Sequence, residues 1–257
     1  MSTAKTPEEQ QERLALIRDK KGFICDMDGV IYHGDTLLPG VKDFIEWLKA
    51  EEKKYLFLTN NSAPTPRELR DKLLRLGVDV DESHFYTSGI ATAKFLSSQI
   101  PNPDFVVVGE GTGFSFEKIS KATKLVLEGS RLIATNPDSN SPGQGGVIIP
   151  ATGAFVSPIE IATGRKAFAC GKPSSLMMSY AQKILGTSRD ETCIIGDRMD
   201  TDILAGIYSE IHPVLVMSGV TRHISDLEEY AYKPYLVLEG VKEILEQSSD
   251  ESKANEK

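Results

Sequence analysis

Short apolar runs alternate with amphipathic stretches along this chain, and the alternation predicts its secondary structure. The apolar runs are continuous, which is typical of parallel strands covered on both faces. They fall at residues 22–25, 55–58, 105–108, 132–135, 192–195 and 214–217, with an edge-strand candidate at 235–238 and a short strand or extended loop at 147–149. Helical periodicity predicts helices at residues 7–18, 41–49, 66–76, 116–127 and 175–185. Because strands and helices alternate throughout, the sequence predicts an α/β fold with a doubly wound, mainly parallel sheet.

Two of the predicted helices begin at a capping box. Thr6 and Thr65 are each followed by proline and, three residues on, by Glu9 and Glu68. In such a box the threonine hydroxyl and the glutamate carboxylate satisfy backbone N–H groups at the start of the helix. Gly77 is placed to end the second of these helices.

Composition narrows the class of protein. The chain has 257 residues, of which 40% are hydrophobic and 26% are charged, as is typical of a soluble globular protein. Its formal charge of −8 argues against binding nucleic acid, since the phosphate backbone requires a basic surface. No apolar run is long enough to span a membrane, and the polar, acidic N-terminus is unlike a signal peptide. The three cysteines form no CxxC pair, so we expect them to be reduced and the protein to be cytoplasmic.

The most informative polar segment is Asp26-Met27-Asp28-Gly29, which follows the first predicted strand. Two carboxylates at positions i and i+2 of a strand end share one face of the strand. Like charges this close are costly unless a cation lies between them, and an oxygen-rich site suits Mg²⁺. The glycine allows a tight turn and a close approach to a ligand. The end of the first strand is thus a candidate site for a metal ion and an anion.

Three further polar clusters follow a strand or precede a helix: Thr59-Asn60, Lys172, and Asp197 with Asp202. In a doubly wound sheet the carboxyl ends of the strands gather on one edge, so we expect the four clusters to converge. Together they supply what phosphoryl transfer requires. One carboxylate can attack phosphorus, a second can act as acid and base, and hydroxyl, amide and backbone N–H groups can hold the phosphoryl oxygens. A lysine and a Mg²⁺ ion bound by further carboxylates offset the negative charge.

The order of these motifs resembles that of the haloacid dehalogenase (HAD) superfamily of phosphatases. The matching segments are Asp-Met-Asp-Gly-Val (26–30), Leu-Thr-Asn-Asn-Ser (58–62), Gly-Lys-Pro (171–173) and Gly-Asp-Arg-Met-Asp-Thr-Asp-Ile (196–203). The chain resembles in particular the NagD-like subfamily, which includes p-nitrophenyl, phosphoglycolate and pyridoxal phosphatases. The segments that carry this finer resemblance are residues 59–62, 134–138, 162–166 and 204–206. The resemblance extends from about Phe23 to Leu245.

The resemblance implies a role for each motif residue. Asp26 is the implied nucleophile, and Asp28 is the implied general acid and base, which also binds Mg²⁺ through its backbone carbonyl. The implied phosphate-binding residues are Gly29, Thr59, Asn60, Asn61 and Lys172, of which Lys172 also stabilises the nucleophile. The implied metal site consists of Asp26, Asp28, Asp197 and Asp202. For Asp202, a purely structural hydrogen-bonding role is an equal alternative.

The resemblance also implies a cap domain inserted into a Rossmann-like core. We expect residues 20–86 and 166–246 to form the discontinuous catalytic core and residues 87–165 to form a smaller α/β cap. Residues 1–19 are expected to form an N-terminal helix, and residues 247–257 a disordered tail. Asn136 and Asp138, in the cap segment, are candidate substrate contacts, and stabilisation of a turn is the alternative for Asp138. Pro101-Asn102-Pro103 stands where related sequences usually carry an additional strand–helix–strand portion, so we expect a shortened cap.

The expected activity is Mg²⁺-dependent hydrolysis of a small phosphorylated metabolite through a phosphorylated Asp26, by a monomer or homodimer. Nucleoside monophosphates, sugar phosphates, phosphoglycolate and aryl phosphates all fit this substrate class. A phosphotransferase or phosphomutase with the same nucleophile, and a non-catalytic phosphate-binding regulator, are alternative functions. A receiver-like signalling domain also uses acidic residues and a lysine, but the chain length and the large insertion argue against it. His33 has no partner at an informative spacing, and we interpret it as a loop histidine.

Overall fold

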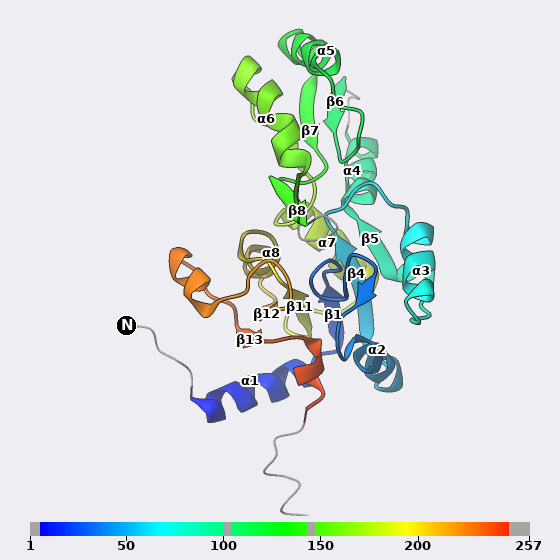
Figure 1. The fold of residues 1–257 in the computed structure, drawn as a ribbon, viewed down its shortest axis with the longest axis vertical. Helices are drawn as coiled ribbons and strands as arrows, with labels where there is room; N and C mark the ends of the chain where they lie inside the picture. Colours follow the sequence, from blue (N-terminus) through cyan, green and yellow to red (C-terminus); the bar gives the residue numbers. More distant parts are fainter. Residues whose placement is uncertain (1–5, 100–103, 143–146, 247–257) are drawn as a thin grey trace, which may run out of the picture. The chain divides into compact units, whose positions relative to one another are not determined.

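The computed structural model describes residues 6–99, 104–142 and 147–246 (Figure 1). The α-helices are α1 (Pro7–Arg18), α2 (Val41–Ala50), α3 (Pro66–Arg75), α4 (Ser88–Ser97), α5 (Phe116–Leu127), α6 (Thr152–Thr163), α7 (Ser175–Leu185) and α8 (Leu204–Tyr208). Short turns of 3₁₀-helix are η1 (Glu82–His84), η4 (Ile224–Glu229) and η5 (Val241–Ile244), and η3 (Met199–Ile203) is a π-helix. The predicted tail and Pro101-Asn102-Pro103 lie outside the described residues.

The strands are β1 (Gly22–Cys25), β2 (Tyr32–His33), β3 (Thr36–Leu37), β4 (Lys54–Thr59), β5 (Phe85–Thr87), β6 (Phe105–Val108), β7 (Arg131–Ala134), β8 (Asn140–Pro142), β9 (Ile148–Pro150), β10 (Phe168–Ala169), β11 (Thr192–Gly196), β12 (His212–Val216) and β13 (Leu236–Leu238). Each apolar run of the sequence overlaps a strand, whereas β2, β3, β5, β8 and β10 were not predicted. The segment that was predicted as a strand or loop forms β9, which pairs with β8 in antiparallel fashion. His33 lies in the short strand β2 and not in a loop.

The central sheet has six strands in the order β13-β12-β11-β1-β4-β5. The pairs β1–β11, β11–β12, β12–β13 and β4–β5 are parallel. The chain therefore runs outward from β1 in both directions, which confirms the doubly wound α/β prediction. In such sheets, ligands bind beyond the carboxyl ends of the strands where the order reverses, and here this point is at β1.

Contacts within the chain divide it into two compact units, residues 1–56 with 185–257 and residues 57–184. In the first unit, every residue of β1 and β11 is buried. The Phe23 ring of β1 packs edge-on against Phe44 and Trp47 of α2, with ring centroids 6.2 and 5.6 Å apart. These aromatic contacts hold α2 against β1, so β1 and the polar segment that follows it are rigidly supported.

The second unit contains a smaller parallel sheet in the order β10-β7-β6. Alternate residues of β6 and β7 pack with α5 and α6 (Figure 1) around an apolar core formed by Val106, Val108, Val126, Leu132, Ala134, Val156 and Ile159. The sequence analysis did not predict α6, which contains Pro158 and has no side-chain cap. The domain boundaries expected from the family resemblance, at residues 87 and 165, stay a prediction.

Both predicted capping boxes are present. Thr6 and Thr65 accept from the N–H groups of Glu9 and Glu68, whose carboxylates accept from the N–H groups of the two threonines. Among the described residues, no helix is both long and apolar enough to cross a membrane.

Candidate active site

Three buried aspartates of the first unit form an acidic group at the ends of neighbouring strands. Asp26 follows β1, Asp197 follows β11, and Asp202 lies in η3. A carboxylate oxygen of each lies within 4.8 Å of those of the other two, and the residues are 8%, 2% and 0% exposed, respectively. We call Asp26, Asp197 and Asp202 the acidic group. The structure thus brings together three of the four residues that the sequence predicted for the metal site.

The register of β1 and β11 explains why two of these aspartates meet. Cys25 lies opposite Ile195 in the parallel pair, and the Asp26 N–H donates to the Ile195 carbonyl at 2.9 Å. The residue that follows each apolar strand therefore emerges at the same edge of the sheet. Asp202 is held by a different contact, because the Arg198 N–H donates to Asp202 Oδ2 at 3.1 Å.

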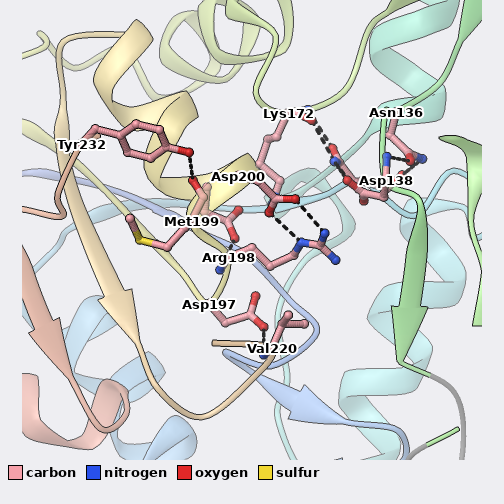
Figure 2. Close-up of polar contacts among 11 residues, drawn as sticks. Asn136, Asp138, Lys172, Asp197, Arg198, Met199, Asp200, Val220 and Tyr232 are labelled. Atoms are coloured by element: carbon pink, nitrogen blue, oxygen red, sulfur yellow. Dashed lines mark hydrogen bonds and ion pairs between the residues drawn. The ribbon is translucent and has the colours of Figure 1, made fainter. Parts of the chain in front are cut away.

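Two contacts hold the N-terminal end of the π-helix that carries Asp202. The Arg198 guanidinium pairs with Asp200 at 3.0 Å, and the Tyr232 hydroxyl donates to the Met199 carbonyl at 3.1 Å (Figure 2). Irregular π-turns inside helices are frequent at functional sites. In this chain the turn places Asp202, and not the exposed Asp200, in the acidic group.

A loop after β12 packs against Asp197. The Val220 N–H donates to Asp197 Oδ2 at 2.5 Å (Figure 2), and the Thr221 N–H donates to the Asp197 backbone carbonyl at 3.1 Å. Gly219 makes this approach possible, since a Cβ at that position would lie 1.9 Å from Asp197 Oδ2. This loop was not predicted from the sequence, although a serine and a glycine directly after an apolar run are the kind of signal that identified Thr59-Asn60.

Asp28 is not part of the acidic group. It is partly exposed, and the Tyr32 hydroxyl donates to Asp28 Oδ2 at 3.5 Å. Burial, together with the Asp28 and Asp26 carboxylates, raises the pKa of Tyr32, so this phenol stays protonated and remains a donor. Gly29 has a φ of +81° and its N–H donates to the Tyr32 carbonyl at 2.9 Å, which closes the turn before β2. The expected backbone metal contact of Asp28 and phosphate contact of Gly29 stay predictions.

The acidic group fits a hard divalent cation. All of its candidate ligand atoms are carboxylate oxygens, which are the ligands that Mg²⁺ and Ca²⁺ prefer. Three like charges this close and this buried strongly favour a cation between them. Asp26, Asp197 and Asp202 are the residues that would hold it.

A second polar cluster lies within the second unit and is centred on Asn60. The Lys172 N–H donates to Asn60 Oδ1 at 2.7 Å, and Asn60 Nδ2 donates to the Lys172 carbonyl at 3.0 Å. The same Nδ2 donates to both carboxylate oxygens of Asp138, at 3.1 and 3.2 Å (Figure 2). Asn136 Nδ2 in turn donates to the Asn60 carbonyl at 2.8 Å. We call Asn60, Asn136, Asp138 and Lys172 the amide network.

The other residues predicted to bind phosphate lie beside this network. Thr59 is buried, and its Oγ1 accepts from the Asn61 N–H at 3.1 Å. Asn61 Oδ1 accepts from the Ala63 N–H at 3.0 Å, so the two side chains shape the turn that follows β4. Lys172 is 2% exposed, and its Nζ donates to the Leu58 carbonyl at 3.2 Å. The structure therefore groups Thr59, Asn60, Asn61 and Lys172, while their roles toward phosphate stay predictions.

The three cysteines are free and buried. Burial raises the pKa of Cys25, and the neighbouring Cys193 and Asp26 add to the effect. Burial also raises the pKa of Cys193 to about 12. Both thiols are protonated at neutral pH, so Cys25 packs in the core and is no nucleophile despite its place beside Asp26.

Two family models match the chain. A model described as haloacid dehalogenase-like hydrolase matches residues 23–119, and a model for HAD-hydrolase-like proteins matches residues 169–244. Together the two matches include the acidic group, Thr59, Asn60 and Lys172.

Curated phosphatases and solved phosphatase structures also match the chain over most of its length. The chain is 35% identical to the dihydroxyacetone phosphatase of Corynebacterium glutamicum (strain R), over 86% of this chain and 90% of that protein. It is also 35% identical to the ribonucleotide monophosphatase NagD of Escherichia coli (strain K12), over 87% of this chain and 98% of that protein. The crystal structure of a 4-nitrophenylphosphatase from Thermotoga maritima superposes with a TM-score of 0.83 at 33% identity, covering 89% of this chain and 97% of that one. The chain therefore belongs to the haloacid dehalogenase-like hydrolases, in their NagD-like subfamily.

Proposed function

We propose that this protein is a Mg²⁺-dependent phosphatase that hydrolyses a small phosphate monoester through a phosphorylated Asp26. Its family makes the chain a phosphoric monoester hydrolase, and the proposal adds the metal, the intermediate and the substrate class. The observation that carries it is the acidic group, in which the implied nucleophile lies within 4.8 Å of two other buried carboxylates. This is the donor set expected where a nucleophile and a phosphoryl group must share one cation.

In the proposed reaction, a carboxylate oxygen of Asp26 attacks phosphorus and forms an acyl phosphate. The ester oxygen leaves as an alcohol after taking a proton from Asp28. Asp28 then removes a proton from water, which attacks the acyl phosphate, releases inorganic phosphate and regenerates Asp26. Partial exposure suits Asp28 to exchange protons with the substrate and with water, and the hydrogen bond from the Tyr32 hydroxyl favours the carboxylate form that acts as the base.

Two cationic groups are assigned to neutralise the negative charge of the carboxylates and of the phosphoryl group. A bound Mg²⁺ would offset the negative charge of the acidic group and of the phosphoryl oxygens. We assign Lys172 to the same task, because a buried ammonium is effective where water is excluded. Thr59 and the backbone of the turn after β4 are assigned to the remaining phosphoryl oxygens.

The relatives support the substrate class. They are named for dihydroxyacetone phosphatase, ribonucleotide monophosphatase and 4-nitrophenylphosphatase activities. We therefore propose a small phosphate monoester such as a nucleoside monophosphate, a sugar phosphate, phosphoglycolate or an aryl phosphate. We place the enzyme in the cytoplasm, as a monomer or homodimer, and its free, buried cysteines support a reducing compartment.

The test is hydrolysis of p-nitrophenyl phosphate by the wild type and by Asp26→Asn, each with Mg²⁺ and with EDTA. We expect turnover that requires Mg²⁺ and that falls by at least about a thousandfold in Asp26→Asn. Asp43→Asn, which changes an exposed carboxylate of α2 in the same unit, is the matched control and should retain full turnover. Undiminished turnover in Asp26→Asn would contradict the proposal, and Mg²⁺ binding with no turnover of any ester would favour a non-catalytic regulator.

A further inference from the structure

The side chain of Asn60 is fully engaged with protein partners. Its Oδ1 accepts from the Lys172 N–H, and its two amide hydrogens are directed at the Lys172 carbonyl and the Asp138 carboxylate. The residue is 7% exposed. Its backbone carbonyl accepts from Asn136 Nδ2 and from the Ser88 hydroxyl. A phosphate could recruit this amide only by breaking bonds that already join three segments of the chain.

Asp138 and Asn136 are themselves fixed by the turn after β7. Asn136 is fully buried, and its Oδ1 accepts from the Asp138 N–H at 3.1 Å. Asn136 Nδ2 also lies within hydrogen-bond distance of Glu110 Oε1 and Thr152 Oγ1, both at 3.2 Å. The Asp138 carbonyl accepts from the Gly153 N–H at 2.7 Å. The carboxylate that meets Asn60 is thus held by the fold of the second unit.

The close approach of Gly171 shows how tightly these segments pack. A Cβ at residue 171 would lie 2.6 Å from Asn60 Oδ1 and 2.7 Å from the Thr135 carbonyl. The Gly171 N–H donates to that same carbonyl at 2.7 Å. The turns after β4 and β7 and the segment before Lys172 therefore meet at the Asn60 amide, with no space for another side chain.

We propose that Asp138 and Asn136 are positioning residues for the phosphate-binding part of the site. Asp138 holds the side chain of Asn60 and Asn136 holds its backbone carbonyl. Through Asn60 they fix the turn that carries Thr59 and the backbone of Lys172. The inference rests on the proposed function and changes two expectations. It assigns the Asn60 amide to this scaffold and not to the phosphate, and it replaces the expected substrate contacts of Asn136 and Asp138 with contacts inside the protein.

The two interpretations predict different responses to Asp138→Ala. A positioning residue affects every substrate alike and also inorganic phosphate, which has no leaving group. A residue that contacts the leaving group affects some esters more than others and leaves inorganic phosphate binding unchanged. We expect Asp138→Ala to weaken phosphate binding about tenfold or more, since a charge-assisted hydrogen bond that holds the turn is lost. The values of kcat/KM for p-nitrophenyl phosphate and for a nucleoside monophosphate should fall by equal factors.

The experiment measures inorganic phosphate binding by calorimetry at saturating Mg²⁺, together with kcat/KM for those two esters. Asp138→Asn keeps one side-chain oxygen that accepts from Asn60, so it should retain most of the phosphate binding. It therefore tests the same position if Asp138→Ala fails to fold. Glu117→Gln, at the exposed start of α5, removes a carboxylate of the same unit and should change nothing.

A double-mutant cycle with Asn60→Ala gives a second test. If Asp138 acts through Asn60, Asp138→Ala should have little further effect in the Asn60→Ala background. Unchanged phosphate binding in Asp138→Ala, with losses that differ between the two esters, would overturn the inference. Calorimetry needs no turnover, so failure of the proposed function, seen as a wild type that hydrolyses no ester, is distinguishable from failure of the positioning role.

Discussion

The acidic group and the amide network both include residues that follow the ends of strands, but they are built on opposite principles. The acidic group gathers three carboxylates within 4.8 Å, so like charges accumulate. The amide network pairs donors with acceptors, as where Asn60 exchanges hydrogen bonds with the backbone of Lys172. A buried cluster of like charge calls for a ligand, whereas a buried cluster of complementary groups rigidifies the fold around it. On this ground we propose that the acidic group binds a cation and that the amide network positions the turn after β4.

Among the variants that distinguish the two clusters, the largest effect is expected from Asp202→Asn, on Mg²⁺ affinity. Removal of one negative charge from the acidic group should weaken Mg²⁺ binding by about 10- to 100-fold, as measured by calorimetric titration with Mg²⁺. The amide still accepts from the Arg198 N–H, so the π-helix should keep its geometry. Asp138→Asn serves as the matched variant in the amide network and should leave Mg²⁺ affinity unchanged. Equal losses of Mg²⁺ affinity in both variants would break the distinction between the two clusters.

A smaller effect is expected from alanine at the two closely approached glycines. Gly219→Ala places a Cβ 1.9 Å from Asp197 Oδ2, and Gly171→Ala places one 2.6 Å from Asn60 Oδ1. Each should lower the free energy of unfolding by about 1–3 kcal/mol, because the neighbours must shift. Mg²⁺ should raise the Tm of Gly171→Ala by the wild-type increment, but that of Gly219→Ala by less.

Two other glycines are the controls for this pair. Among the described residues, a Cβ at Gly111 or Gly240 would meet no atom within 4 Å. Gly111→Ala and Gly240→Ala should therefore unfold as the wild type does. If Gly219→Ala kept the full Mg²⁺-dependent rise in Tm, the loop after β12 would have no part in holding Asp197.

The smallest expected effect concerns pH and a histidine of the first unit. Burial lowers the pKa of His212, with a contribution from Lys20, so the folded state disfavours the imidazolium. Below the unfolded pKa of about 6.5 the unfolded chain binds more protons than the folded one, so stability falls as pH falls through that value. His212→Gln should flatten the loss of stability between pH 7 and pH 5 by less than about 1 kcal/mol, measured by urea unfolding. A steeper loss of stability in His212→Gln would show that the folded state favours the imidazolium, which contradicts the lowered pKa of His212.

More of the fold and of the acidic group than of the amide network could be predicted from the sequence. Most strands of the central sheet and most α-helices followed from apolar runs, helical periodicity and capping boxes, because these signals are local. Asp26 and Asp197 were predictable together, since the ends of neighbouring parallel strands meet at one edge of the sheet. Asn60 was predictable as a polar residue after a strand, but its partner Asp138 is 78 residues away. No local pattern reveals that such a side chain is already engaged. Ser218-Gly219 is a local signal after an apolar run, but nothing local shows that this loop meets Asp197.

The most direct test of the central claim is to trap the covalent intermediate. The wild type would be mixed with Mg²⁺ and an ester whose phosphoryl group is labelled, quenched in acid during turnover, and digested for mass spectrometry. Fragmentation of the peptide that contains both Asp26 and Asp28 separates the two carboxylates. We expect a phosphoryl label on Asp26 and none on Asp28. A label on another residue during turnover would contradict this proposal. So would unlabelled protein when Asp28→Asn, which slows breakdown of the intermediate, is mixed with p-nitrophenyl phosphate, whose leaving group needs no proton.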